Sequence, residues 1–343
     1  MKSLTCAALL LALNLACPVW AQDQQPAPQT PQTQPQQPGV APTTPPQGTQ
    51  PGQATQPPPA KPPRVVGQPQ SQDELNAWVA IEQAATIEEK GKLAEDFLTK
   101  FPESGLTPFA HQLLAFHYQQ QNNFDKFAFH AEKTLEEVPQ NPIMLSALSA
   151  AYAQKGQADK AIDKAQKCLQ ALQQVPKPAQ IGEGEWMLQK DQLTADAHYA
   201  LGVAHVTKYQ QAPAPSGQTD TNLIKAGEEL SKAIELDPSH DRAYYHLGFV
   251  FAKQNNGEKA IENYARAVAL GGPAQSLARD QLQRVYQFVY KNTDGLEQAI
   301  TNQRAYVEKQ VADKRARAQS LQPQQPAPAQ PGAGTQATPP PQP

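Results

Sequence analysis

The spacing of similar segments is the feature that most constrains what this 343-residue chain can fold into. Tyr118 and Tyr152 are 34 residues apart, and Leu114 and Leu148 precede them at the same distance. A period of this length is typical of a hairpin of two helices that stacks on its neighbours to bury its apolar face. Between residues 72 and 321, apolar and Ala residues recur at helical spacing, with no sustained strand alternation. The sequence therefore predicts an all-α fold.

The clearest repeat unit has a glycine in its expected first helix and an alanine in its expected second helix. In chain order its pattern residues are Tyr244, Leu247, Gly248, Phe251, Ala260, Tyr264, Ala267 and Pro273. This order resembles the tetratricopeptide repeat, W-x2-L-G-x2-Y followed by A-x3-F and Pro. Tyr244 stands where that pattern has Trp, and Pro273 comes one residue late. Gly248 and Ala260 would let the two helices approach closely, because neither has a bulky side chain.

Three further segments fit the same frame less closely. The residues expected to pack these repeats include Leu148, Tyr152 and Ala161 in one unit and Leu201, Gly202, Ala226 and Ala233 in another. Gly202 and Ala226 are 24 residues apart, whereas Gly248 and Ala260 are 12 apart, so we expect a 12-residue loop inserted around residues 210–221. A second insertion is expected near residues 176–190. The resemblance implies a right-handed superhelical solenoid of helix-turn-helix repeats.

Proline separates the part of the chain that can fold from its flanks. Of 34 prolines, 15 lie in residues 22–71 and 8 in residues 322–343, where charged residues are scarce. Such composition is typical of disordered, extended segments. We therefore predict a signal peptide at 1–21, a disordered Pro/Gln-rich linker at 22–71, an N-terminal helical hairpin at 72–106, tetratricopeptide-like repeats at 107–273 (107–141, 142–175, 195–240 with the inserted loop, and 241–273), capping helices at 274–321 and a disordered Pro/Gln-rich tail at 322–343.

The first residues have the order of a secretory signal. Lys2 is followed by an apolar run and then by Val19-Trp20-Ala21, which predicts cleavage after Ala21. Leu15-Ala16-Cys17 gives an alternative, because small residues before Cys resemble a bacterial lipoprotein site, with a lipid anchor at Cys17. No later segment has the roughly 20 apolar residues of a spanning helix. We expect an exported protein, periplasmic or secreted, or associated with the outer membrane if Cys17 is lipidated.

The composition and motifs argue against several classes of function. A formal net charge of −3 does not favour nucleic acid as a partner. No phosphate-binding, zinc-protease or nucleophile-elbow motif is present in the sequence, so we expect no enzyme and no cofactor. His198 and His205 lie seven residues apart, which makes a metal site conceivable. Packing between helices explains them better, because they occupy the positions of Tyr244 and Phe251 in the next unit.

The resemblance also implies where a partner would bind. The first helices of such repeats line an inner groove, and the residues there that do not point into the core become candidates. These candidates are Phe109, Gln112, Phe116, Ile143, Ser146, Tyr199, Val203, Arg242, Tyr245, Phe249 and Lys253. We expect their five aromatic residues to form an exposed row that favours an apolar or aromatic-containing peptide. The alternative is that some of these aromatics only seal adjacent repeats.

The sequence thus predicts a non-catalytic scaffold or adaptor of the bacterial cell envelope that binds a segment of another envelope protein in its groove. One alternative is an outer-membrane-anchored repeat lipoprotein in envelope or pilus assembly. Another is a self-assembling structural protein whose first or last hairpin pairs with a second copy. A His-dependent metal-binding protein is the least favoured alternative. The oligomeric state stays open at this point.

Overall fold

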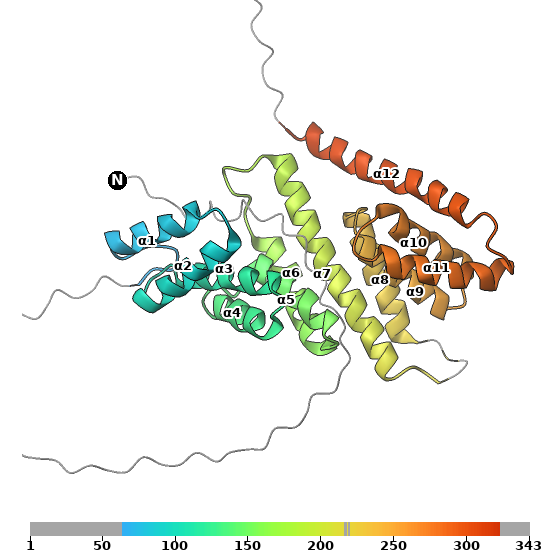
Figure 1. Ribbon diagram of the computed structural model, residues 1–343, viewed down its shortest axis with the longest axis horizontal. Coiled ribbons are helices and arrows are strands. Elements are labelled where there is room, and N and C mark those ends of the chain that lie inside the picture. The colour runs from blue at the N-terminus through green and yellow to red at the C-terminus, as the bar shows by residue number, and fades with distance from the viewer. Residues whose placement is uncertain (1–63, 216–217, 219, 323–343) are drawn as a thin grey trace, which may run out of the picture.

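The computed structural model describes residues 64–322 except 216, 217 and 219, and in this range the chain forms helices and no strands (Figure 1). The helices are α1 (Gln72–Gln83), α2 (Ile87–Lys100), α3 (Thr107–Gln120), α4 (Phe124–Glu137), α5 (Pro142–Gln154), α6 (Ala158–Gln174), α7 (Glu183–Gln211), α8 (Thr221–Leu236), α9 (Asp241–Lys253), α10 (Gly257–Leu270), α11 (Gln275–Tyr290) and α12 (Leu296–Ser320). The all-α helical-repeat fold predicted from the sequence is confirmed. The expected signal peptide, Cys17, residues 22–63 of the linker and residues 323–343 of the tail lie outside the described residues.

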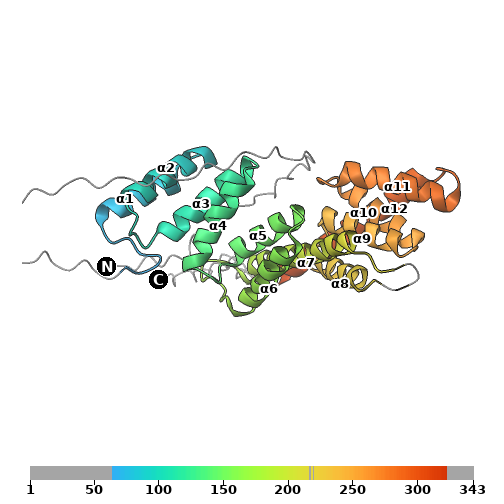
Figure 2. The same ribbon diagram turned by 90° about the horizontal axis from the view of Figure 1, so that it is seen from below.

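Consecutive helices pair as hairpins that succeed one another along the long axis of the molecule (Figure 2). From α1/α2 to α9/α10, each second helix packs on the first helix of its own hairpin and on the first helix of the next. α11 continues the series by packing on α10, whereas α12 runs back along α10 and reaches α7 (Figure 1). Of the helices described, none is both long and apolar enough to cross a membrane.

The turns inside three hairpins are built in the same way. Asn122, Gly156 and Asn255 have positive φ angles of 55°, 69° and 58° and directly precede the N-cap of the second helix. Asn and Gly tolerate this left-handed conformation best. In two of the turns the next residue is another Asn, whose side chain accepts a hydrogen bond from a backbone N–H in the first turn of the helix. These turn residues therefore determine where the chain folds back within each of the three hairpins.

In the hairpins α7/α8 and α9/α10, a glycine of the first helix lies directly against a side chain of the second. A Cβ atom at Gly202 would lie 2.6 Å from the Leu230 side chain, and one at Gly248 would lie 2.8 Å from the Tyr264 ring. Both distances are below a normal carbon contact, so any side chain there would force Leu230 or Tyr264 to shift. The residues expected to pack the repeats, which are Leu148, Tyr152, Ala161, Leu201, Gly202, Ala226, Ala233, Leu247, Gly248, Ala260, Tyr264 and Ala267, are all buried, and Phe251 is half-buried.

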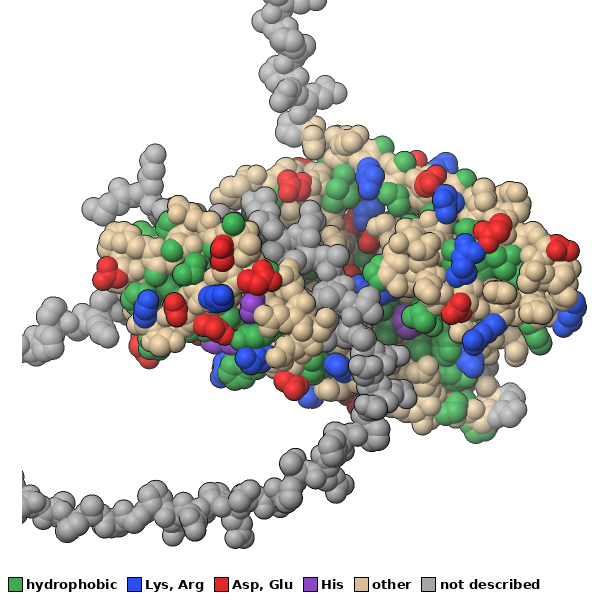
Figure 3. Space-filling view, in the orientation of Figure 1, with side chains coloured by type: hydrophobic (Ala, Val, Ile, Leu, Met, Phe, Trp, Pro, Cys, Tyr) green, Lys and Arg blue, Asp and Glu red, His purple; other side chains and the backbone are tan. Residues whose placement is uncertain are grey.

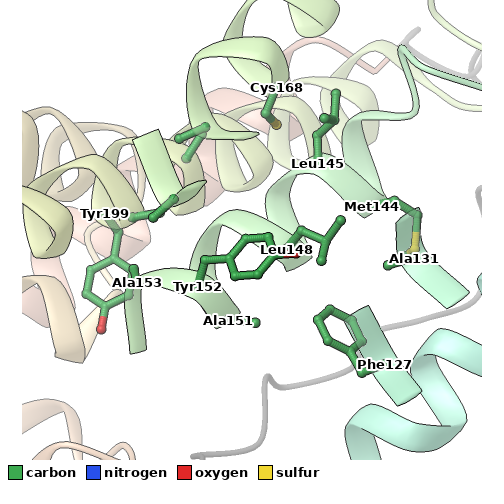
Figure 4. Packing of buried hydrophobic residues seen from close by; sticks show 14 of the residues in the cluster. Phe127, Ala131, Met144, Leu145, Leu148, Ala151, Tyr152, Ala153, Cys168 and Tyr199 are labelled. Carbon is green, nitrogen blue, oxygen red and sulfur yellow. The ribbon is translucent and has the colours of Figure 1, made fainter. Parts of the chain in front are cut away.

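One apolar cluster runs from α1 to α9, and a second joins α9 to α12. Figure 4 shows Phe127 of α4 and Leu148 and Tyr152 of α5 directed into the first cluster. Cys168 is also buried there, its Sγ atom lying 3.3 Å from the Pro142 carbonyl oxygen that accepts its hydrogen bond. Burial raises the pKa of this thiol to about 12. Cys168 therefore packs in the core as an unreactive thiol.

The part of the chain that packs on the helices begins earlier than the predicted boundary at residue 71. Arg64 donates hydrogen bonds to the Ser104 carbonyl and the Thr107 hydroxyl, and its guanidinium lies 2.6 Å from the Glu137 carboxylate. The backbone N–H of Gly67 also donates to the Gly105 carbonyl. The last eight residues of the predicted linker therefore pack against the start of α3 and the end of α4. The proline-rich composition of residues 22–71 as a whole concealed this, because the partners lie between 38 and 73 residues further along the chain.

Two long helices interrupt the regular series of hairpins. α7 has 29 residues and α12 has 25, whereas α3, α5 and α9 have 13 or 14. At their contact, a Cβ atom on Gly184 would lie 1.9 Å from the Ala318 carbonyl oxygen. Lys314 of α12 donates a hydrogen bond to the Leu236 carbonyl at the end of α8, and its Nζ lies 3.6 Å from the Asp191 carboxylate. α12 therefore joins α7 to the end of α8.

We expect Gly248→Ala to destabilise the protein relative to the matched substitution Gly227→Ala. Both sites are helical, so both gain up to about 1 kcal/mol of helix propensity. A Cβ at Gly227 meets only Val250 at an ordinary 3.5 Å, whereas one at Gly248 collides with the Tyr264 ring. Overpacking of this kind costs about 1 to 3 kcal/mol. Chemical denaturation would measure the difference, and equal stability of the two variants would show that the helix crossing is misplaced.

Candidate partner-binding surface

The first helices α3, α5, α7 and α9 carry the residues predicted to bind a partner, and we call the side they share the first-helix surface. Among the candidates, Gln112, Phe116, Ser146, Tyr199 and Val203 are buried, Phe109, Ile143, Arg242, Tyr245 and Phe249 are half-buried, and Lys253 is exposed. The expected exposed row of five aromatics is therefore wrong. Phe116 is only 6% exposed and Tyr199 only 4%.

Contacts between adjacent hairpins account for part of this burial. The Asn141 side chain, which caps α5, donates a hydrogen bond of 2.7 Å to the Gln112 side chain of α3. The Tyr199 ring of α7 lies 4.5 Å from the His240 ring at the start of α9. These residues join neighbouring repeats. For Tyr199 this agrees with the alternative interpretation, in which some aromatics only seal adjacent repeats. Gln112 and Tyr199 were predicted to face a partner, but they contact residues of the next hairpin along the chain instead.

The partly accessible candidates concentrate on α9. Arg242, Tyr245, Phe249 and Lys253 follow one another at spacings of three or four residues, so they form one stripe on the helix, which we call the α9 stripe. The Lys253 ammonium lies 5.4 Å from the centre of the Phe249 ring. The Arg242 guanidinium lies 5.9 Å from the Tyr199 ring. The stripe therefore has two aromatic rings at its centre and a cation at each end.

The aromatic rings of the α9 stripe are held in place by their neighbours. The Tyr245 ring lies 5.8 Å from the Tyr264 ring of α10 and 5.0 Å from the His246 ring. Burial raises the pKa of Tyr245, so its phenol is neutral at physiological pH. Such rings offer flat apolar surface whose conformational entropy is already lost, which favours binding of apolar side chains.

The histidines that suggested a metal each contact a polar side chain of α8. His198 Nδ1 lies 2.5 Å from the Glu229 carboxylate, and His205 Nδ1 lies 3.2 Å from the Asn222 side-chain oxygen. Both contacts link α7 to α8, which supports packing between helices as their role. Within residues 64–322, leaving aside the three undescribed loop positions, no three His, Cys, Asp or Glu side chains are grouped as metal ligands.

Sequence reasoning missed a second histidine pair, His111 of α3 and His130 of α4. Their Nδ1 atoms lie 2.9 Å apart, and the Tyr118 ring stacks on His130 at 5.4 Å between centres. Burial lowers the pKa of both histidines, and the neighbouring His111 helps to bring that of His130 to about 4. The turn near Asn122 was the available signal, because an antiparallel hairpin folded there places residues 111 and 130 opposite each other.

A hollow lies beneath α12, and none of the predicted partner-binding residues lines it. It has a volume of about 650 Å³ and is lined by α7, α8 and α12, with Asp191, Lys232, Lys314 and Arg317 among its charged residues. A second hollow of about 330 Å³ adjoins it and is lined by Tyr244, Arg266 and Tyr306, among others. The lining mixes both signs of charge, and Lys314 is already engaged with Leu236 and Asp191. These features fit an internal brace better than a ligand site.

No protein-family model matches this chain, and a search of curated proteins finds none similar to it. Solved structures with a similar fold include the MamA RS-1 ArsTM double mutant, with 17% identity over 59% of this chain and 96% of its own and a TM-score of 0.43. TTC0263, a thermophilic TPR protein of Thermus thermophilus, has 19% identity over 62% of this chain and 98% of its own, with a TM-score of 0.41. Yeast Tom70 has 16% identity over 70% of this chain and 42% of its own, also with a TM-score of 0.41. The likeness is one of fold alone.

We expect His130→Gln to make stability less dependent on pH. In the unfolded chain a histidine has a pKa near 6.5, whereas in the folded chain that of His130 is about 4. Between these values the unfolded state binds a proton that the folded state does not, so stability is fully present above about pH 6.5 and is lost as the pH falls toward 4. The Tm of the unsubstituted protein should therefore fall more steeply between about pH 7 and pH 5.

Thermal scans of both proteins at several pH values would measure this. The difference in Tm at about pH 8, where His130 is neutral in the folded and the unfolded chain, gives the packing effect of the substitution and is subtracted. Parallel pH profiles would contradict the burial of a neutral histidine at this position.

Proposed function

We propose that this protein is a non-catalytic scaffold of the bacterial cell envelope that binds a segment of another protein on its first-helix surface, with the α9 stripe as the main contact. One observation carries the proposal. Tyr245 and Phe249 stay partly accessible, and each lies one turn from a cation, whereas Phe116 and Tyr199 on the same surface are buried. Rigid aromatic rings next to cations are typical of the energetically important centre of an interface.

The chemistry of the stripe indicates the chemistry of the partner. Apolar or aromatic side chains of a bound segment would pack on Tyr245 and Phe249. Acidic side chains would pair with Arg242 and Lys253, which lie 11 residues and thus about 16 Å apart on the helix. We therefore expect an extended or helical segment with an apolar centre and acidic flanks. Its affinity should fall as salt is raised, because exposed ion pairs are screened.

The location in the envelope rests on the N-terminal sequence. Residues 1–21 have the order of an export signal, and Cys17 offers the alternative of a lipid anchor at the outer membrane. Residues 22–63 would then lie in the chain between the point of attachment and the helical repeats.

The intact mass of the protein purified from cells decides between the two attachments. Cleavage after Ala21 predicts a chain that begins at Gln22 and carries no lipid. Lipidation predicts a chain that begins at Cys17 with added acyl mass. A mass that includes residues 1–16 would contradict both forms of export.

The binding proposal is tested with the mature chain, residues 22–343, used to capture proteins from envelope extract. The test variant is Phe249→Glu, which puts a carboxylate into the α9 stripe. The matched control is Phe129→Glu, because Phe129 lies on the second helix α4 and is 56% exposed. Phe116 is unsuitable for such a change, since its burial makes unfolding the expected result. Circular dichroism would check that both variants remain helical.

We expect a partner that is retained by the unsubstituted chain and the control but reduced at least about ten-fold with Phe249→Glu. This corresponds to the loss of about 1.4 kcal/mol or more that truncating a central aromatic contact causes. Equal capture by all three proteins would move the binding site away from α9. Loss with both variants would indicate a general effect of added charge.

A further inference from the structure

The outward side of α11 carries an apolar pair that the fold leaves uncovered. Ala278, Leu282 and Tyr286 of this helix are buried against the repeats. Leu277 is 58% exposed and Phe288 is 75% exposed, the highest values among the large apolar side chains of the described residues. They are 11 residues apart, which is three helical turns, so both lie on the same side of α11. Figure 3 shows apolar and charged side chains over this end of the molecule.

Two opposite charges lie between these apolar residues. Asp280 and Arg284 are exposed and one turn apart on α11, and neither has an ion-pair partner among the described residues. The neighbouring Arg279 is different, because it pairs with Glu297 of α12 at 2.6 Å. The order along the outward side is therefore Leu277, Asp280, Arg284 and Phe288, which we call the α11 stripe.

The α11 stripe is complementary to itself. Its members lie almost symmetrically about a point between residues 282 and 283. If a second α11 runs antiparallel across this point, each Leu277 faces the Phe288 of the other copy. Each Asp280 then faces the Arg284 of the other copy. A two-fold axis repeats every such contact, so the stripe provides two apolar contacts and two ion pairs.

We propose that a second copy of this chain docks on α11, with the two α11 helices antiparallel across a two-fold axis. The order of the two charges favours this partner. If residues 280 and 284 carried the same charge, two copies would repel each other in this arrangement. The ammonium of Lys291, the residue that directly follows α11, lies 4.7 Å from the centre of the Phe288 ring, and most of that ring remains accessible. The dimer would carry two α9 stripes, so a partner with two binding segments would gain avidity.

The size of the stripe sets the strength of the dimer. A contact one helix wide buries less than the 1,200 to 2,000 Å² of a stable protein interface. We therefore expect a reversible dimer with a dissociation constant on the order of 10 µM. Its formation does not depend on the proposed binding at α9.

Charge reversal tests the pairing directly. Asp280→Arg leaves two arginines on each stripe, and Arg284→Asp leaves two aspartates, so each variant should be repelled by its own copy. Both residues are exposed, so neither change should affect folding. When the two variants are mixed, every Arg faces an Asp, and a heterodimer should form. The double variant Asp280→Arg, Arg284→Asp should dimerise like the unsubstituted chain.

Sedimentation velocity of residues 22–343 between about 1 and 200 µM would measure these equilibria. We expect each single variant to dimerise at least about ten-fold more weakly, and the equimolar mixture to regain dimerisation. A monomeric unsubstituted chain over the whole range would overturn the proposal. Unchanged dimerisation of the single variants, or a mixture that stays monomeric, would also overturn it. Phe249→Glu should dimerise normally, which separates this result from that of the binding experiment.

Discussion

The whole array depends on the close crossing of the two helices in a hairpin. At Gly202 and Gly248 the absence of a side chain lets Leu230 and Tyr264 of the second helix lie directly on the first helix. This contact fixes the distance between the helices, and the next first helix then packs on the second. The orientation of α9, and with it the accessibility of Tyr245 and Phe249, follows from a series of such contacts. A binding surface built this way needs little ordering when a partner arrives.

The C-terminal half differs from a plain series of repeats because α12 turns back over it. The helix connects α10, the end of α8 and the extended start of α7, with Gly184 allowing the closest approach. It thereby lines the hollow of about 650 Å³ and joins the hairpin α7/α8 to α10 of the next hairpin. Because α12 does not extend the array, none of the described helices covers the outward side of α11 (Figure 1). The path of α12 thus explains both the brace and the exposed side of α11, on which the dimer contact is proposed.

The hairpins could be predicted from sequence because their signals are local. Turn residues such as Asn255 and small residues such as Gly248 act within about 15 positions of one another. The accessibility of individual groove residues could not be predicted, since Tyr199 is covered by His240 from another hairpin. The same limit applies to Arg64, which binds Glu137, and to Gly184, which contacts Ala318. No periodicity in the sequence reports contacts over such distances, and the α12 brace and the packing of residues 64–71 were missed for that reason.

The central claim is that the α9 stripe is the surface on which a partner docks. Hydrogen-exchange mass spectrometry of the mature chain, alone and saturated with its captured partner, tests this most directly, because it reports protection along every described helix at once. The account predicts slower exchange in α9 and in the adjoining half of α7, with little change in α4 and α6. Protection confined to the second helices, to α12 or to the residue 210–221 loop, with α9 unchanged, would contradict it.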